Sequence, residues 1–291
     1  MTIPRRSLLA AGLALATSPA LAQPATPLER RLAQIEARSG GRLGVAILVA
    51  GTSRHAGHRL DERFPLCSTF KALAAAAVLA RVDAGQERLD RPVRFTREQV
   101  VAYSPGTEAG AGGPGLPMRH LCEAAVTLSD NTAANLMLDS LGGPAGLTAW
   151  LRGLGDATTR LDRMEPELNE GTPGDPRDTT RPLAMSQTLE KLILGEALKP
   201  DSRALLTRWL VENKTGDERL KAQLPAGWRA GEKTGTGPRG STNDAGILWP
   251  ADGSAPLLVS AYLTGTSAPL AARNAALAEV GKAVAEFYKA V

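Results

Sequence analysis

The chain has 291 residues, of which 43% are hydrophobic and 22% are charged, a composition typical of a globular protein. Its formal net charge is only +4 and it contains no basic block, which argues against nucleic acid as a partner. Aromatic residues make up 4% of the chain, so the core must consist mainly of Ala, Leu and Val.

The first 22 residues have the pattern of an export signal. Arg5 and Arg6 precede an apolar run that ends in the small residues Ala-Leu-Ala at 20–22. The paired arginines followed by Ser-Leu-Leu indicate the twin-arginine route to the periplasm. The apolar run is too short for a permanent membrane span, and no later segment approaches one. Removal of 22 residues from 291 leaves a mature chain of 269, residues 23–291, and its formal charge falls from +4 to +2.

The mature chain begins with a predicted helix and two predicted strands. In residues 27–39, PLERRLAQIEARS, apolar residues recur at helical spacing, and two glycines end the pattern. Residues 42–51, RLGVAILVAG, predict a buried strand. The following SRHAGHRL predicts a hairpin turn into a second strand.

Residues 68 to about 212 are predicted to be mostly helical, and strand-like runs then alternate with turns before a C-terminal amphipathic helix. Strands at both ends around a helical middle predict one sheet built from both ends of the chain. We expect an α/β lobe of about 23–62 and 213–291, an all-helical lobe of about 63–212, and a ligand site in the cleft between them.

One long segment, residues 163–182, interrupts the helical pattern. Its sequence, RMEPELNEGTPGDPRDTTRP, contains four prolines and two glycines, which exclude regular structure. A loop of this length inside a compact lobe is usually functional or disordered. Arg163 and Asp178 can form an ion pair across its neck. We therefore expect an ordered loop that carries Glu165 and Asn169.

The cysteines and histidines do not suggest a metal site. The two cysteines, Cys67 and Cys122, have no zinc-like spacing with His55, His58 or His120. His55 and His58 lie in a polar segment that resembles a solvated turn. We therefore expect chemistry without a metal, another cofactor or a histidine base.

A serine and a lysine stand three residues apart at the head of an alanine-rich helix predicted from residue 70 to 84. Residues i and i+3 share a helix face, so the Ser68 hydroxyl and the Lys71 amine can meet. The first turn of a helix also favours developing negative charge. A serine beside a base is a nucleophile pattern. Taken alone, the tetrapeptide favours a helix cap followed by a solvated lysine, because S-x-x-K is common by accident.

Three further motifs complete a recognisable set. Ser129-Asp130-Asn131 lies between two helical runs, and Lys233-Thr234-Gly235 lies on a C-terminal strand. Singly, these motifs predict a helix cap and an edge strand. With Ser68-x-x-Lys71 and R-M-E-P-E-L-N at 163–169, their order and spacing resemble those of the class A serine β-lactamases over about residues 28–290. The resemblance implies an α+β fold with a five-stranded antiparallel sheet, flanking helices and a helical lobe.

The resemblance implies a catalytic role for several of these residues. Ser68 would attack the lactam carbonyl, and either Lys71 or Glu165, acting through a water, would take its proton. The backbone N–H groups of Ser68 and Thr236 would form the oxyanion hole. Ser129 would relay a proton to the departing nitrogen, and Asn169 would help to hold the hydrolytic water.

Other residues are implied in substrate binding. Asn131 would hold the substrate's side-chain amide, while Lys233, Thr234 and Gly235 would receive its carboxylate. Two more positions take part: Arg219 falls where some relatives carry a guanidinium that braces the carboxylate, and Tyr103 resembles the gate aromatic at the cleft rim.

Some features depart from common family patterns. Thr242 stands where other relatives carry the carboxylate-bracing arginine, and a glycine-rich insert occupies residues 106–115. The usual disulfide partners of Cys122 and Cys67 are replaced by Ala75 and Gly237, so we expect two free thiols.

The resemblance also implies a cis peptide bond between Glu165 and Pro166, where the family's loop turns sharply.

Three functions fit these motifs: a hydrolytic β-lactamase, a cell-wall D-alanyl-D-alanine peptidase or transpeptidase, and a non-catalytic β-lactam sensor. Glu165 and Asn169 favour the first, since a general base and an amide can hold and activate a hydrolytic water. A sensor would need a membrane tether. We expect a monomeric periplasmic enzyme whose partner is a small-molecule β-lactam that binds without a cofactor.

Overall fold

The computed structural model describes residues 25–289, so the export signal expected over 1–22 lies outside the described residues. The helices are α1 (Pro27–Ser39), α2 (Phe70–Asp83), α3 (Met118–Thr127), α4 (Asn131–Leu141), α5 (Gly143–Gly153), α6 (Pro182–Ile193), α7 (Pro200–Val211) and α8 (Leu270–Lys289). Within residues 25–289, no helix is both long and apolar enough to cross a bilayer.

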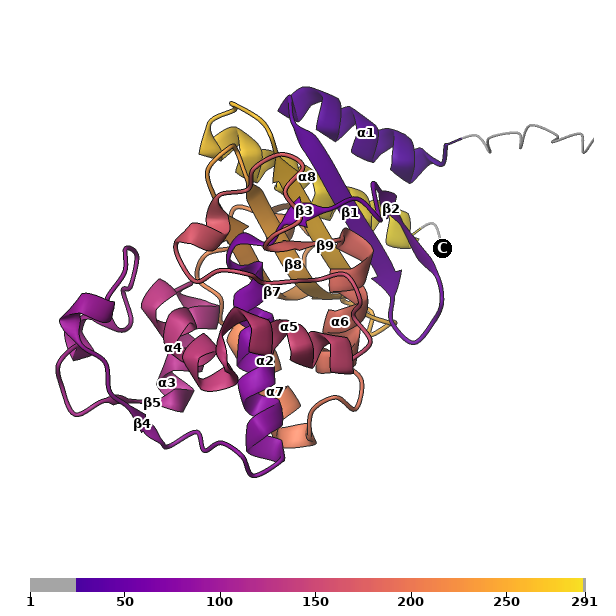
Figure 1. The fold of residues 1–291 in the computed structure, drawn as a ribbon. Coiled ribbons are helices and arrows are strands. Elements are labelled where there is room, and N and C mark those ends of the chain that lie inside the picture. Colours follow the sequence, from indigo (N-terminus) through magenta and orange to yellow (C-terminus); the bar gives the residue numbers. More distant parts are fainter. Residues whose placement is uncertain (1–24, 290–291) are drawn as a thin grey trace, which may run out of the picture.

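One five-stranded antiparallel sheet organises the fold (Figure 1). Its strands are β1 (Arg42–Val49), β2 (His55–His58), β7 (Arg229–Thr236), β8 (Thr242–Trp249) and β9 (Leu257–Thr264), in the order β2-β1-β9-β8-β7. The first and last strands of the chain meet where β1 pairs with β9 along its whole length. The predicted sheet from both chain ends is confirmed, and β7 is left as an edge strand.

The sheet is covered on both faces because its strands alternate between two apolar cores. Leu43, Val45 and Ile47 of β1 pack with α1 and α8, whereas Leu48 joins the core shared with α2 and α6. Helix α1 starts at a capping box of Thr26 and Glu29 and is followed by a left-handed glycine.

Helix α2 lies at the centre of the helical part of the molecule, and every residue from Phe70 to Leu79 is buried. A helix that is apolar all round belongs inside a core. Its alanines present little bulk, so neighbouring helices α3, α4, α5 and α7 can contact it closely. This explains how a chain poor in aromatic residues builds a large core.

Short elements complete the fold and correct the prediction that the loop 163–182 has no regular structure. The small strands are β3 (Phe64–Pro65), β4 (Pro92–Val93), β5 (Leu116–Pro117) and β6 (Thr179–Thr180), and the 3-10 turns are η1 (Cys67–Thr69), η2 (Arg97–Gln99), η3 (Glu108–Gly110), η4 (Glu167–Asn169) and η5 (Leu220–Gln223). The loop 163–182 thus contains a 3-10 turn and a short strand, because six residues separate Pro166 from Pro173 and five separate Pro176 from Pro182.

The histidines near the first hairpin are not in a solvated turn. His55 and His58 are the ends of β2, which pairs with β1, and His58 Nε2 lies 3.0 Å from Glu36 Oε2. Pairing with a neighbouring strand satisfies the backbone of this polar segment, so its composition was a poor guide to its structure.

Candidate active site

Ser68 lies at the junction between the turn η1 and helix α2, against the edge strand β7. Ser68 is 7% exposed, and Cys67 before it has a left-handed backbone with φ of 43°. A Cβ at Gly235 of β7 would lie 3.0 Å from Leu66 O and 3.2 Å from Ser68 N. A side chain here would be crowded, so glycine favours the close approach that brings the Ser68 amide beside the end of β7.

Lys71, in the first turn of α2, is fully buried and contacts residues of two other motifs. Its Nζ lies 3.0 Å from Glu165 Oε1 and donates to Ser129 O at 2.8 Å and to Asn131 Oδ1. The Ser68 hydroxyl donates to the same Glu165 Oε1 at 3.4 Å. The direct Ser68–Lys71 contact expected from their spacing is not among these hydrogen bonds. Glu165 instead connects the two groups.

Burial makes both active-site lysines easier to deprotonate. Desolvation lowers the pKa of the Lys71 ammonium from its ordinary value, although Glu165 opposes this shift. Desolvation also lowers the pKa of Lys233 well below its ordinary value, and the nearby charges of Lys71 and Arg219 add to the effect. Such shifts are typical of lysines that exchange protons during catalysis.

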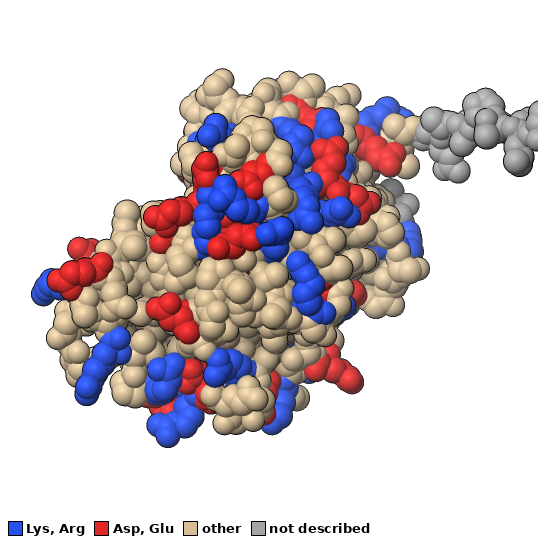
Figure 2. All heavy atoms as spheres, in the orientation of Figure 1, with Lys and Arg blue, Asp and Glu red and all other residues tan. Residues whose placement is uncertain are grey.

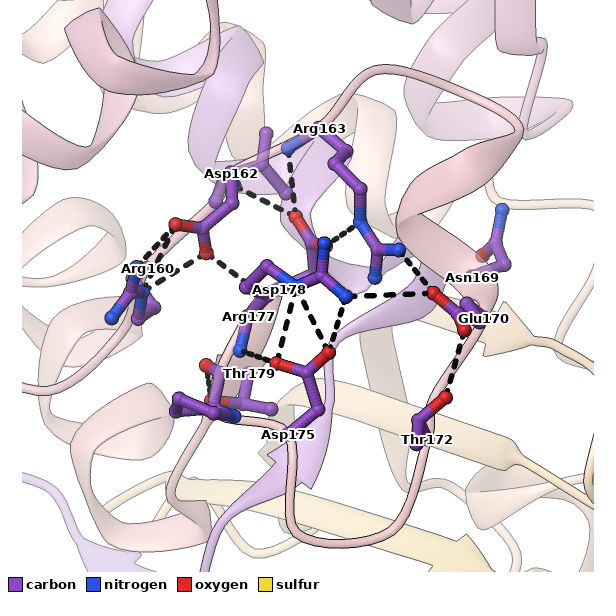
Figure 3. Close-up of polar contacts among 12 residues, drawn as sticks. Arg160, Asp162, Arg163, Asn169, Glu170, Thr172, Asp175, Arg177, Asp178 and Thr179 are labelled. Atoms are coloured by element: carbon purple, nitrogen blue, oxygen red, sulfur yellow. Dashed lines mark hydrogen bonds and ion pairs between the residues drawn. The ribbon is translucent and has the colours of Figure 1, made fainter.

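The loop 163–182 is held by a network of charged side chains (Figure 3). Arg163 Nε lies 2.6 Å from Asp178 Oδ2, which confirms the ion pair predicted at the loop neck. The other oxygen of Asp178 accepts hydrogen bonds from the backbone N–H groups of Asp162 and Arg163, at 2.7 and 3.0 Å. Asp178 O also accepts from Leu66 N at 2.8 Å, which couples the loop neck to the segment before Ser68.

Glu165 is positioned by two amide side chains. Asn135 Oδ1 accepts from Glu165 N at 2.8 Å, and Asn135 Nδ2 donates to Glu165 O at 2.9 Å. Asn169 Nδ2 donates to the carboxylate oxygen Oε2, while Asn169 Oδ1 is buried without a hydrogen-bond partner among the described residues. The Glu165–Pro166 bond is cis, as expected.

Asn135 was not among the residues predicted from the sequence. Its signal is its position four residues after Asn131 in α4, because residues i and i+4 share a helix face.

The Ser129-Asp130-Asn131 motif shapes the rim of the site. Ser129 and Tyr103 both have left-handed backbones, with φ of 61° and 62°, a strain that is common at functional sites. Asn131 Nδ2 donates to Ala102 O at 2.8 Å, and Asn131 N donates to Tyr103 O at 3.0 Å. Tyr103 is 62% exposed at this rim.

Asp130 is the helix cap that its motif predicts, and it also binds the start of the glycine-rich insert. Its carboxylate caps α4 through Ala133 N and accepts from Gly106 N at 2.8 Å and Thr107 N at 3.0 Å. The start of the glycine-rich insert is therefore fastened to the helix that follows Ser129.

Strand β7 places its lysine and threonine opposite this rim. Lys233 Nζ donates to Ser129 Oγ at 3.1 Å and to Thr234 O at 2.9 Å. The Thr234 hydroxyl is hydrogen-bonded to the hydroxyl of Thr215, a residue that was not predicted. Between the end of β7 and the long loop lies a hollow of about 530 Å³, lined by Asn169 and Thr236 among others.

Arg219 is buried behind β7 with only 5% of its surface exposed. Its Nη1 donates to Gly235 O at 2.9 Å and to Asn243 O at 2.8 Å, and its Nη2 donates to Thr236 Oγ1 at 2.7 Å. A second arginine, Arg273, was not predicted, although its Nη1 donates to the Thr242 hydroxyl at 3.0 Å. The geometry therefore favours an action of Arg219 through Thr236.

Replacing Arg219 by alanine is expected to reduce kcat/KM for carboxylate-bearing lactams roughly ten- to a hundredfold, since a charge-assisted hydrogen bond contributes about 1.5–3 kcal/mol. Arg219→Lys should retain part of the effect, because an ammonium supplies charge without the planar fork. Steady-state kinetics measures kcat/KM for the wild type and both variants, and the Tm of each protein checks that it is folded. Wild-type kinetics in Arg219→Ala would show that the guanidinium only supports the strand.

Both cysteines are free and buried, as expected. Burial raises the pKa of the Cys67 thiol to about 12 and that of Cys122 higher still. Because the thiolate is the reactive form, neither thiol is set up for nucleophilic chemistry.

A pair of buried carboxyl groups lies on β7 and β8, next to the Lys233-Thr234 segment of the site. Glu232 and Asp244, on β7 and β8, are 1% and 0% exposed. Asp244 accepts from Leu220 N at 3.2 Å, and Lys221 Nζ lies 3.4 Å from Glu232 Oε1. Desolvation raises the pKa of Glu232 well above its ordinary value, with Asp244 adding to the effect, and it also raises the pKa of Asp244. The pair is thus expected to share a proton in the folded protein.

This shared proton predicts a specific dependence of stability on pH. The unfolded carboxyls release their protons near pH 4, so at higher pH the folded state binds a proton that the unfolded state has lost. The pair's contribution is therefore complete below the unfolded pKa and declines by about 1.4 kcal/mol per pH unit until the raised folded pKa is passed.

Glu232→Gln removes this titration while keeping the side-chain shape. Urea unfolding between about pH 5 and pH 9 should show the wild type losing stability relative to Glu232→Gln as pH rises. If the free energy of unfolding changed with pH in the same way in both proteins, a shared proton would be contradicted.

Comparisons with known proteins agree with this geometry. A sequence profile of the Beta-lactamase enzyme family matches residues 27–288. A beta-lactamase of Streptomyces albus G is 45% identical over 263 residues, covering 89% of this chain and 83% of the relative. Beta-lactamase CTX-M-8 of Citrobacter amalonaticus is 44% identical over 276 residues, covering 95% of this chain and 94% of the relative.

Solved structures give the same result. An ancestral class A β-lactamase of Gram-negative bacteria superimposes with a TM-score of 0.87 at 61% identity, covering 89% of this chain and 99% of that one. The putative class A β-lactamase PenP of Rhodopseudomonas palustris has a TM-score of 0.88 at 57% identity, covering 90% and 100%. With its Ser68, Lys71 and Glu165 cluster in the same fold, this chain belongs to the class A serine β-lactamases.

Proposed function

We propose that this β-lactam hydrolase opens the amide bond of penicillins and cephalosporins through an acyl-enzyme on Ser68, which Glu165 then helps to hydrolyse. The observation that carries the mechanism is the position of one buried carboxylate. Glu165 contacts the Ser68 hydroxyl and Lys71 through Oε1 and the amide of Asn169 through Oε2. A single base thus reaches both the nucleophile and the place where a hydrolytic water would be held.

In acylation, Ser68 Oγ attacks the lactam carbonyl and its proton passes towards Glu165 Oε1, the acceptor that it contacts at 3.4 Å. Lys71, whose pKa burial lowers, is the alternative acceptor. The amides of Ser68 and Thr236 would stabilise the oxyanion. Ser129, which accepts a hydrogen bond from Lys233, would then give its hydroxyl proton to the lactam nitrogen as the amide bond breaks. The proton taken from Ser68 would return to Ser129 through Lys71, which contacts both Glu165 and the Ser129 backbone, so Glu165 is again a carboxylate before deacylation.

In deacylation, a water would donate one hydrogen bond to Glu165 and another to Asn169 Oδ1, the buried oxygen that lacks a partner among the described residues. Glu165 removes a proton from the water as the water oxygen attacks the ester carbonyl. Glu165 then gives this proton to Ser68 Oγ as the ester bond breaks. Lys233 and Thr234 would bind the substrate carboxylate, with Arg219 supporting Thr236 from behind. Asn131 and Tyr103 would contact the substrate's side chain at the rim.

The cellular role follows from this chemistry. Hydrolysed β-lactams are inactive as antibiotics, so the enzyme gives resistance. The arginine pair and apolar run within residues 1–22 support export to the periplasm, where we propose that the enzyme acts as a monomer.

Intact-mass measurement after mixing with a penicillin tests this function. A transient adduct followed by free enzyme and hydrolysed penicillin is the expected result. An adduct that persists on the wild-type protein would instead identify a transpeptidase or a β-lactam sensor.

A further inference from the structure

A hollow of about 620 Å³ lies on the outer side of the long loop and is not lined by any of the proposed catalytic residues. One wall is the loop segment 171–176, and the other consists of residues 40–42 at the start of β1 and 264–265 at the end of β9. Three arginines, Arg42, Arg63 and Arg239, also line it. Its volume falls in the range of small-molecule sites.

Two of these arginines have no acidic partner among residues 25–289. Arg239 is exposed and donates only from Nε, to Glu170 O at 3.2 Å. Arg63 donates from Nη1 to Thr158 O and to Thr179 Oγ1, both at 2.9 Å. The remaining guanidinium N–H groups of both side chains form no hydrogen bond with described residues.

The acidic residues of the same hollow are already neutralised. Glu62 lies 3.0 Å from Arg42 and 2.8 Å from Arg59, and Asp175 lies 2.6 Å from Arg177. These carboxylates therefore do not compensate the charges of Arg63 and Arg239. In Figure 2 the charged side chains gather in a band over the region where β3 lies in Figure 1, with both signs intermixed.

Further positive charge faces Arg63 from neighbouring elements. Desolvation lowers the pKa of Arg63, and repulsion from Arg181, Arg160 and Arg152 adds to this shift, while Asp156 opposes it. Arg160 itself is paired with Asp162. Arg63 thus lies in a part of the molecule where an added anion would relieve repulsion between cations.

We propose that this hollow binds a small, multiply charged anion bearing phosphate or carboxylate groups, held between Arg63 and Arg239. Guanidinium groups bind both kinds of group with paired hydrogen bonds. Arg239 belongs to the connection between β7 and β8, and residues 171–176 belong to the long loop. A bound anion therefore ties the long loop to the connection between two strands of the sheet.

Thermal unfolding at constant ionic strength tests this site, with pyrophosphate and citrate as separate probes and chloride as the balancing salt. A probe at ten times its dissociation constant should raise the Tm of the wild type by about 3–6 °C. Arg63→Gln and Arg239→Glu should each lose most of this shift. Arg54→Gln, which changes an exposed arginine with no side-chain hydrogen bond among the described residues, should keep it.

The comparison between variants separates this site from the catalytic cleft. Anions bound near Lys233 raise the Tm of every variant equally, so only the difference between Arg239→Glu and Arg54→Gln reports the hollow. Because Arg239 is exposed, Arg239→Glu remains informative if Arg63→Gln fails to fold. Hydrogen exchange of residues 171–176 should slow at least threefold with the probe. Equal Tm shifts in Arg239→Glu and wild type, or unchanged exchange, would overturn the proposal without affecting the hydrolytic function.

Discussion

Glu165→Gln is expected to hold a penicilloyl group on Ser68 long enough for the adduct to be weighed. Glutamine keeps the size of the side chain and can still contact Asn169, but it cannot accept the proton of an attacking water. Loss of a general base typically slows its step about a hundred- to ten-thousandfold. Glu165 also contacts the Ser68 hydroxyl at 3.4 Å, so acylation should slow as well. It should slow less than deacylation, because Lys71 remains as the alternative acceptor of the Ser68 proton.

Mass spectrometry of the intact variant, followed by digestion, measures this effect and places the adduct on the peptide containing Ser68. The matched control is Glu167→Gln, which changes an exposed glutamate two residues further on, at the start of the turn η4. It should turn over penicillin at nearly the wild-type rate. A folded Glu165→Gln protein with wild-type turnover and no adduct would refute the proposed deacylation mechanism.

The parts of the site predicted from the sequence are those with local spacing rules. The Ser68-x-x-Lys71 motif predicted that both residues lie at the start of a helix. The order and spacing of the four motifs indicated the family, and with it the five-stranded antiparallel sheet. Asn135 could have been found by the same helical rule, from its spacing to Asn131. Spacing alone predicted a direct hydrogen bond between Ser68 and Lys71. It could not show that Glu165, from a distant loop, lies between the two groups and contacts both.

Features that depend on pairing between distant segments were beyond sequence reasoning. The proton-sharing pair follows from the β7–β8 register, in which Thr234 lies opposite Asp244 and Glu232 lies two residues away on the same face. The burial of Arg219 similarly depends on carbonyls from two strands. The arginine hollow brings together segments near residues 42, 63, 174, 239 and 265, which no sequence pattern relates.

Lys71→Met is expected to give the opposite kinetic result to Glu165→Gln. The Lys71 ammonium contacts Glu165, Ser129 and Asn131, so its removal leaves the Glu165 carboxylate buried without its cation. Removing one partner of a buried ion pair typically costs about 3–5 kcal/mol of stability. The nucleophile also loses the amine that favours its deprotonation, so acylation should fall by about a hundred- to ten-thousandfold.

Stopped-flow measurement with a chromogenic cephalosporin distinguishes these effects, provided that the Tm of Lys71→Met stays above the assay temperature. Slow acylation should give no initial burst and no adduct by mass, whereas Glu165→Gln should give a burst followed by a stall. Lys221→Met provides a control, since it removes a lysine that lies beside Glu232 and Asp217 and takes no part in the proposed chemistry. A full burst at the wild-type rate in Lys71→Met would show that the lysine only neutralises Glu165. Proton removal from Ser68 would then belong to the carboxylate alone, and Glu165 would act as the base in both halves of the reaction.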